Sequence, residues 1–411
     1  SLSKSKSSPL ELIFVDVQDS EENKSGNNQT KLPAGIYAPN SKTIVIELKE
    51  PNSYIVYFLA NSFAFPVPKH VVTTFGDSWS KIEHLVTNVP FQVVKHQIGH
   101  SMRLIPSNLF YEEIAGNIAY IDILWIEKWQ ERLARYEAGD LDVLSLWNLP
   151  PEEMKRVRQR LAADYVTSPW FQNTYITLNT RQTPFDDVRV RQAFVLALNR
   201  SYLSMVKHGF DSPAIGGFIP PGMFGHSPGI GLAFDPEKAR SLLAEAGYAD
   251  GKRFPSITGI IYSAYAPIQD YLSKQWAENL KVNVQWEVLD WLDYQEKAHQ
   301  NSYDLVFNGW VADYPDPDNI LRLATHMNRT GWHHAKYEGL LNAAKNLPSM
   351  NKRKRMYQEA DEILIHDVGV IPISYGRWHL LIKPHIKRFP ASPLHYHFWK
   401  DILIEDRPDA V

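Results

Sequence analysis

The stretch that decides the fold is residues 257–307, which read ITGIIYSAYAPIQDYLSKQWAENLKVNVQWEVLDWLDYQEKAHQNSYDLVF. Short β-branched runs alternate there with segments whose apolar residues recur at helical spacing. The pattern predicts strands at 257–262, 282–289 and 303–307, and helices at 267–280 and 291–299. This alternation indicates an α/β layer with parallel strands. Ligands of such sheets sit beyond the carboxyl ends of the strands, which directs attention to the residues after Phe307.

The same reasoning extends outward along the chain. Polar, turn-rich residues 18–33 indicate an exposed loop. Asp187 is placed to cap a helix that begins at Val188, and Gly139 to end an earlier one. Further strands are expected at 43–48, 174–178 and 371–375, and further helices at 125–138, 188–198, 235–246, 336–346 and 351–366.

Composition excludes several classes of protein. The chain has 411 residues, which at about 100–200 residues per domain suggests two or three lobes. Its formal net charge is −3 and its pI about 6.6, without the basic excess of a nucleic-acid binder, and a membrane-surface role is equally unsupported. It has no cysteine, and no apolar run of about 18 residues that would span a membrane. Ser1–Ser8 lacks the apolar core of a signal peptide.

Four segments together carry a family resemblance. They are AGDLD (138–142); LNT (178–180) followed by PFDDVRVRQA (184–193) and ALNR (197–200); FDPEKAR (234–240) with LLAEAGY (242–248); and GWVADYPDP (309–317). In order and spacing they resemble the dipeptide- and oligopeptide-binding proteins of family 5 of the extracellular solute-binding proteins, which serve ABC importers. A weaker similarity covers residues 36–120, including FPVPKH at 65–70.

The resemblance implies a two-lobed α/β fold of the periplasmic-binding-protein type (cluster C, type II), with parallel-rich mixed sheets and helices on both faces. Residues 81–180 and 381–411 would form lobe one and residues 181–380 lobe two. Residues 1–80 would be a remnant of the family's small extra domain and the edge of lobe one. The chain departs from the family at residues 87–91, which read TNVPF without the family's glycines. The family also carries a further N-terminal segment that has no counterpart here.

The function implied by the resemblance is capture of di- or oligopeptides and their delivery to a membrane ABC permease. The protein would be periplasmic or extracellular, monomeric, free of cofactors and not an enzyme. Hinge closure around the ligand would be driven by differential affinity for the open and closed forms. Three alternatives remain: a ligand-sensing domain of a regulator or receptor, a binder of nickel or sugar instead of peptide, and a scaffold that has lost binding.

The candidate ligand-binding residues lie at or just past the ends of predicted strands, and the most important of them follows Phe307. The resemblance implies that Asp313 pairs with the α-amino group of a peptide, and a charge-assisted hydrogen bond suits that role. Asp313 could instead only cap the turn made with the following prolines. For Trp310, cleft lining and core filling both remain open. The other candidates flank Asp313 or stand at strand ends: Tyr314, Asn308, Tyr262, Tyr265 and Tyr375.

Metal and enzyme sites find little support. His333 and His334 would point apart, whereas His395 and His397 could share one face of a strand, but no third ligand is fixed near either pair. Catalytic signatures such as GxSxG, HExxH and the phosphate-binding loop are absent from the sequence. The acids at 313, 316 and 318 could suggest paired catalytic carboxylates. We expect them to be solvent-exposed acids of a proline-rich turn instead.

Overall fold

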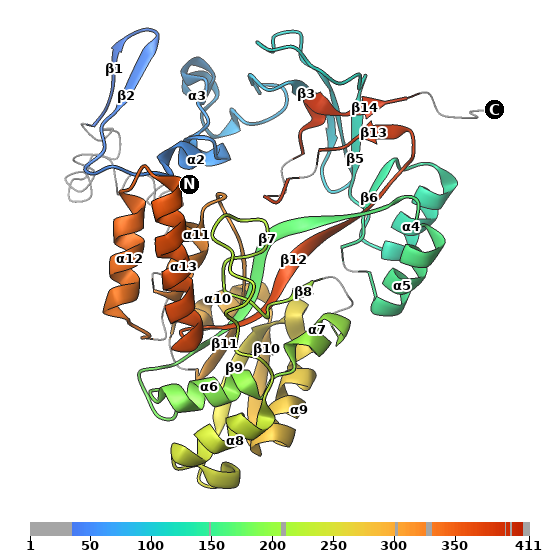
Figure 1. Cartoon of the computed structure of the whole chain (residues 1–411). Helices are drawn as coiled ribbons and strands as arrows, with labels where there is room; N and C mark the ends of the chain where they lie inside the picture. The colour runs from blue at the N-terminus through green and yellow to red at the C-terminus, as the bar shows by residue number, and fades with distance from the viewer. Residues whose placement is uncertain are drawn as a thin grey trace. The chain divides into compact units, whose positions relative to one another are not determined.

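The computed structural model describes residues 35–147, 149–206, 211–300, 303–325, 331–390, 392–394 and 397–405 (Figure 1). These residues divide into two compact units. Unit 1 holds the described residues up to Phe65, Phe171–Leu203 and Pro213–Tyr375; unit 2 holds Pro66–Trp170, the described part of Ser204–Ser212, and the described residues from Gly376 onward. Two long strands begin in one unit and end in the other: β7 (Tyr165–Leu178) and β12 (Ile371–Ile382).

A seven-stranded mixed sheet organises the chain. Its strand order is β10-β9-β11-β7-β12-β6, with β8 paired to β12. Strands β10, β9 and β11 run parallel, while β11 is antiparallel to β7 and β12 to β6. The predicted mixed α/β sheet is therefore confirmed, although the cited pairs are parallel and antiparallel in equal number, so the expected excess of parallel strands is not seen among them. The shorter strands are β6 (Val143–Ser145), β8 (Ser212–Pro213), β9 (Ile257–Tyr262), β10 (Val284–Leu289) and β11 (Leu305–Val311).

Helices cover both faces of this sheet in unit 1. The core face carries Ile176, Ile261 and Phe307, which are completely buried against the helices α6 (Val188–Leu196), α8 (Pro236–Glu245) and α9 (Gln269–Leu280). The opposite face carries Ile260, Tyr262 and Val306, and packs against α10 (Trp291–His299). Period-2 alternation along each strand accounts for this division of side chains.

Local capping fixes where the helices begin. The side chain of Asp187 accepts a hydrogen bond from Arg189 N, and that of Asp235 from Lys238 N, so both act as N-caps. Gly139 ends α4 (Trp129–Ala138) with a φ of +86°, a conformation that glycine adopts without strain. The predicted cap at Asp187 and the predicted end at Gly139 are confirmed.

The rest of unit 1 flanks the sheet. Helices α12 (Ala335–Lys345) and α13 (Met350–His366) pack side by side (Figure 1). Near the start of the described chain, Tyr54 and Phe58 pack against Tyr314. The remaining elements are β1 (Ile36–Asn40), β2 (Thr43–Ile46), α2 (Ile55–Leu59), α7 (Arg200–Val206, continuing into unit 2) and α11 (Pro317–Leu321), with 3-10 turns at 62–64, 249–251, 263–268 and 322–324.

Unit 2 has its own small cores. Helices α4 and α5 (Pro151–Arg160) pack through Tyr136, Met154 and Val157. A three-stranded antiparallel sheet, in the order β3-β4-β5, contributes a second cluster around Phe91 and Ile121. The elements are α3 (Lys69–Phe75), β3 (Phe91–Gln97), β4 (Ser101–Pro106), β5 (Ile121–Leu124), β13 (Ile386–Arg388) and β14 (Leu403–Ile404), with 3-10 turns at 76–78 and 399–401. No described helix is both long and apolar enough to cross a bilayer.

Several predicted bounds were wrong. The strand predicted at 303–307 runs from Leu305 to Val311, because β7 pairs with it along that whole length. The strand predicted at 174–178 is the end of a longer one, and the helix predicted at 125–138 begins only at Trp129. Pairing partners decide how far a strand continues, and periodicity within one segment does not contain them. The loop predicted at 18–33 lies outside the described residues.

The buried carboxyl group of Asp361 holds the loop that follows β8 through hydrogen bonds to its backbone. Asp361 of α13 is completely buried and accepts hydrogen bonds from Phe218 N (2.6 Å) and Ile219 N (3.3 Å). Gly217 approaches so closely that a Cβ there would lie 2.0 Å from Asp361 Oδ2. Burial raises the pKa of Asp361 to about 7, although the two backbone hydrogen bonds oppose that shift.

We expect this carboxyl to make stability fall as the pH rises. Its folded pKa lies above the unfolded value of about 3.9, so the folded state holds the extra proton between about pH 4 and pH 7. The stabilisation is therefore complete below about pH 4 and is lost as the pH rises through 7. In Asp361→Asn, which cannot ionise, thermal unfolding at pH 5 and pH 8 should show a smaller loss of Tm than in the wild type. Exposed Asp270→Asn serves as the control, and parallel profiles for wild type and Asp361→Asn would contradict the assignment.

Candidate functional site

Strand β11 outruns its neighbour β9. Among the described residues, β9 pairs with β11 only at Leu305, Val306 and Phe307. On its other side β11 is paired with β7 from Leu305 to Val311. The chain leaves β9 at Tyr262 and enters the 3-10 turn 263–268, so no described strand follows β11 further. Asn308–Val311 therefore has one paired edge and one open edge.

The open edge presents the backbone groups of Gly309 and Val311. Ala312 N donates to Phe171 O at 2.8 Å across the pair with β7. In an antiparallel pair, successive residues turn their N–H and C=O alternately toward and away from the partner strand. Trp310 therefore shares the orientation of Ala312 toward β7. The backbone groups of Gly309 and Val311 point the other way, toward the open edge.

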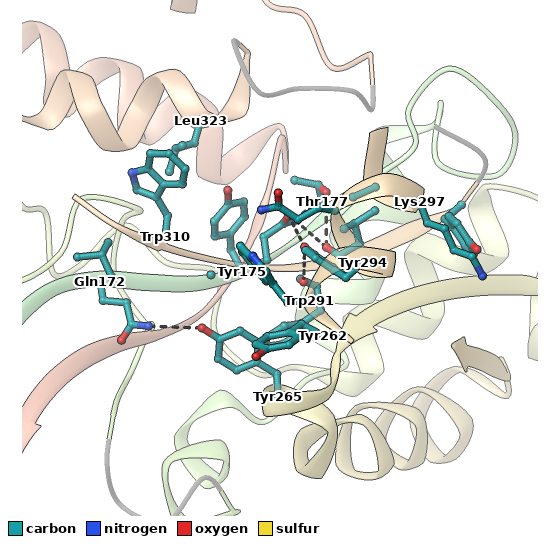
Figure 2. Close-up of a pocket in the computed structure, with 18 of the residues that line it drawn as sticks. Gln172, Tyr175, Thr177, Tyr262, Tyr265, Trp291, Tyr294, Lys297, Trp310 and Leu323 are labelled. Carbon is teal, nitrogen blue, oxygen red and sulfur yellow. Dashed lines mark hydrogen bonds between the residues drawn. The ribbon is translucent and has the colours of Figure 1, made fainter. Parts of the chain in front are cut away.

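A pocket with a volume of about 260 Å³ lies beside this edge (Figure 2). Most of its lining comes from the sheet face that carries Tyr262, Asn308 and Trp310, which we call the pocket face, and from α10 above it. Figure 2 shows Trp310 and Lys297 near opposite ends of the pocket. The full lining is Gln172, Tyr175, Thr177, Asn179, Tyr262, Tyr265, Trp291, Tyr294, Gln295, Lys297, Ala298, Tyr303, Val306, Phe307, Asn308, Gly309, Trp310, Val311 and Leu323.

Aromatic rings dominate the pocket face. The ring centroids of Tyr262 and Trp291 lie 5.3 Å apart in an edge-to-face arrangement, and Trp291 is half exposed. The Tyr294 hydroxyl donates to Phe307 O at 2.9 Å and lies 3.0 Å from Asn308 Oδ1. Asn308 Nδ2 in turn donates to backbone and side-chain oxygens of the sheet. The Asn308 side chain is thus held in one orientation by the protein itself, while the rings offer flat apolar surface.

The far end of the pocket carries no net charge. Lys297 pairs with Glu287, and the Tyr303 hydroxyl donates to Glu287 Oε2 at 2.6 Å. These partners lower the pKa of Glu287 and raise that of Lys297, each mainly through the side-chain hydrogen bond between them. Both groups stay ionised near neutral pH, so positive and negative charge cancel at this end.

On the core face, Tyr265 fills the place of a missing side chain. A Cβ on Gly309 would lie 2.3 Å from the Tyr265 hydroxyl and 3.0 Å from its Cζ. The Tyr265 ring also packs on Phe307, with centroids 5.3 Å apart. Gln172 Nε2 donates to the Tyr265 hydroxyl at 3.5 Å (Figure 2). Only glycine at position 309 allows this ring to lie across β11.

Asn319 organises the turn after β11. Its Oδ1 accepts hydrogen bonds from the indole Nε1 of Trp310 (3.0 Å) and from Asp313 N (3.1 Å). Its Nδ2 donates to Asp313 Oδ2 at 3.0 Å. The Asp313 carbonyl also accepts from Asn61 Nδ2 at 3.2 Å. One amide therefore fixes both the half-buried indole and the carboxylate that follows it.

The Asp313 carboxyl is partly removed from water. Its residue keeps exposed surface, yet the surrounding protein desolvates the carboxyl and raises its pKa, against the opposing hydrogen bond from Asn319. A desolvated carboxylate gains more from a bound cation than a fully hydrated one does. The position can therefore hold an ammonium group.

The other two acids of the turn are structural. We expected Asp316 and Asp318 to be solvent-exposed, and this was wrong, because both are completely buried. Asp316 Oδ2 accepts from Arg353 Nη2 at 2.5 Å and its other oxygen caps α11, while Asp318 pairs with Arg322 at 2.7 Å. Each carboxylate is neutralised by an arginine, so neither is available for paired-carboxylate chemistry.

The seven predicted ligand residues are divided by the structure. Tyr262, Tyr265, Asn308 and Trp310 line the pocket. Asp313 stands in the turn beyond it. Tyr314 is buried, stacked on Tyr54 with ring centroids 5.3 Å apart. Tyr375 is buried and donates its hydroxyl hydrogen to Gly217 O. Ligand contact by any of the seven stays a prediction.

Several residues of the pocket were not predicted from the sequence. Trp291 and Tyr294 on α10 follow the end of β10, and the strand-end rule that selected Tyr262 could have found Trp291. Gln172 comes from β7, whose pairing with β11 has no signature in the sequence. Asn319 was not singled out, because its role depends on the fold of the preceding turn.

The histidines have local roles where they are described. His333 pairs with Glu338, and His334 Nδ1 accepts from Tyr337 N at 3.3 Å to cap α12. His395 lies outside the described residues, so the 395/397 pair cannot be placed. Among the described residues, no group of three or more His, Asp or Glu side chains is arranged to hold a metal ion.

Comparisons with known proteins give a consistent family. A family model described as bacterial extracellular solute-binding proteins, family 5 Middle, matches residues 14–332. The probable deoxycholate-binding periplasmic protein YgiS of Escherichia coli is 27% identical over 387 residues, covering 90% of this chain and 71% of YgiS. The periplasmic oligopeptide-binding protein OppA of Salmonella typhimurium is 26% identical over 389 residues, covering 90% of this chain and 70% of OppA. Haemophilus influenzae OppA, solved in complex with RPPGFSPFR, superposes with a TM-score of 0.73 at 25% identity, covering 96% of this chain and 79% of that one.

Replacing Asn319 by alanine should destabilise unit 1 by about 1–2 kcal/mol, because the half-buried indole Nε1 of Trp310 and the Asp313 backbone lose their acceptor. Urea-induced unfolding measures the effect. Exposed Asn283→Ala, expected within about 0.5 kcal/mol of the wild type, is the control. If the two variants unfold alike, Asn319 does not organise the turn.

Proposed function

Because this chain belongs to the bacterial extracellular solute-binding proteins of family 5, we propose that it captures peptides in an extended conformation and delivers them to an ABC importer. The family acts outside the cytoplasm, and so does this protein. The observation that carries the proposal is the open edge of β11 at Gly309 and Val311, beside the Asp313 carboxylate.

An open strand edge is suited to a peptide backbone. Gly309 and Val311 each offer an N–H and a C=O, spaced two residues apart along β11. A peptide in extended conformation presents its own backbone groups at the same spacing, whatever its side chains, and can add as a further strand. A sugar or a bare metal ion has no such repeat. The edge therefore favours peptides over the sugar and nickel alternatives.

Asp313 supplies the charge that a free peptide terminus needs. An α-ammonium group would form a charge-assisted hydrogen bond with the Asp313 carboxylate. The hydrogen bond from Asn319 Nδ2 already fixes the orientation of that carboxylate. The positive charge of a bound cation would also favour the ionised carboxylate and so oppose the desolvation that raises the pKa of Asp313. A peptide without that ammonium group would leave the carboxylate unpaired, which gives selectivity for free N-termini.

Two relatives support the choice of ligand class. The Salmonella protein carries oligopeptide binding in its name, and the Haemophilus structure holds a peptide. The Escherichia coli relative is instead named for deoxycholate, so a bile acid belongs among the ligands to be tested.

The family consists of binding proteins, and we propose that this chain has no catalytic activity. The acids nearest to Asp313 support this view, since Arg353 and Arg322 neutralise them within the fold. Closure of the two lobes around ligand, monomeric state and the permease partner stay predictions. A role as a ligand-sensing domain would use the same site, and sequence features beyond the binding fold would distinguish it.

Free peptides should stabilise the protein against heat, and N-acetylated peptides should do so far less. At 100 times its Kd, a ligand adds about 2.7 kcal/mol of stability, which a thermal-shift assay resolves. The assay compares tetrapeptides, their N-acetyl forms, deoxycholate, a monosaccharide and nickel, on the wild type and on Asp313→Asn.

The matched control for the peptide assay is Asp270→Asn, an exposed aspartate on α9 that should respond like the wild type. The proposal is wrong if no free peptide shifts the wild type, or if deoxycholate alone does. Equal responses to free and acetylated peptides would instead remove Asp313 from the role of ammonium ligand.

A further inference from the structure

The two faces of the sheet beside the open edge of β11 leave different amounts of space for the side chains of a bound peptide. Side chains of a strand added beside Gly309 and Val311 would alternate between the two faces of the sheet. On the pocket face, every second ligand side chain would meet the cavity of about 260 Å³ and its aromatic walls. On the core face, they would meet Tyr265.

The Tyr265 ring can cover the core face beside the open edge because Gly309 has no side chain there. Its hydroxyl occupies the position in which a side chain at 309 would stand, and its ring rests on the buried ring of Phe307. The contact with Phe307 prevents the ring from sinking further. A bulky ligand side chain on this face would therefore collide with the Tyr265 ring. Phe307 blocks movement of that ring toward the core, so the ring could move only toward solvent.

The pocket face selects by chemistry as well as by size. Rings of Tyr262, Trp291 and Trp310 supply apolar surface. The charged groups near the far end, Lys297 and Glu287, are paired with each other. A large apolar or aromatic side chain fits these walls, and a charged one would lose water without finding a free counter-charge.

Resting on the proposed peptide capture, we infer that the site selects peptides in which a bulky apolar side chain alternates with a small one. Gly309 and Tyr265 are the residues that set this pattern. Tyr265 enforces the small side chain on the core face, and Gly309 positions Tyr265. The ligand class is thus narrower than extended peptides in general.

Four isomeric tetrapeptides built from two Phe and two Ala residues test the inference by isothermal titration calorimetry. Ala-Phe-Ala-Phe and Phe-Ala-Phe-Ala place both rings on one face, whereas Ala-Phe-Phe-Ala and Phe-Phe-Ala-Ala force one ring onto the core face. One of the two alternating isomers should bind at least about tenfold more tightly than both adjacent isomers, because a ring on the core face would overpack against Tyr265; tenfold in Kd is 1.4 kcal/mol. Composition and net charge are the same in all four.

Tyr265→Ala should remove the difference by improving the binding of the adjacent isomers, leaving the four within about threefold of one another. The control is Tyr202→Ala on α7, where an exposed ring that lines no part of the pocket packs on Tyr271. This control should keep the wild-type preference.

A second measurement tests the geometry without any ligand. Gly309→Ala should lower the Tm of the wild type, since the new Cβ meets the Tyr265 hydroxyl. The same substitution in a Tyr265→Ala background should lower the Tm much less, because the colliding ring is gone. Equal losses in the two backgrounds would show that Gly309 does not position Tyr265.

The outcomes separate this inference from the function on which it rests. If all four tetrapeptides bind within about threefold of one another, or if an adjacent isomer binds best, alternation is overturned and peptide capture stands. If none of the four binds, the proposed function is overturned, and the inference with it.

Discussion

The site depends on one mismatch of strand lengths: β11 continues to Val311 while β9 has already ended at Tyr262. Strand β11 stays extended beyond β9 because, on its opposite edge, the long strand β7 pairs with the full length of β11. An open edge is usually a risk for aggregation. Here it is confined to the end of one strand and is bordered by Tyr265 on one face and by Trp310 on the other. A short, bordered edge can receive one ligand strand without becoming a surface for uncontrolled pairing.

The turn that follows β11 is held by charges buried within it. A buried ion pair often costs more in desolvation than it returns, so stability alone is a poor reason for Asp316–Arg353 and Asp318–Arg322. Geometry is a better one. Asp316 also caps α11, and α11 carries Asn319, which orients Asp313. The buried pairs therefore specify a single path for the turn, and through it the position of the exposed carboxylate.

The strands and helices that carry this site could be predicted from the sequence, whereas the way they pair and pack together could not. Strand 257–262 and helix 291–299 were placed at their observed bounds, because both depend on periodicity within a segment. The continuation of β11 past Phe307 was missed, since it depends on β7, more than a hundred residues earlier in the chain. Trp310 could not be assigned to cleft or core for the same reason: its half-buried indole donates to Asn319, which only the tertiary fold of the turn brings to it. Asp316 and Asp318 look like surface acids until Arg353 and Arg322 are brought to them.

Backbone pairing and side-chain discrimination make opposite demands on a peptide site, and the two faces of this edge show how one strand can meet both. Backbone hydrogen bonds to Gly309 and Val311 do not depend on the ligand's side chains, so they contribute affinity for any extended peptide. Discrimination must then come from what the neighbouring faces exclude. A glycine at position 309 serves both demands, because it is the residue that lets Tyr265 reach across β11 while its own N–H and C=O remain at the edge. Any side chain at this position would displace the ring that excludes ligands, although the backbone that binds them would be unchanged.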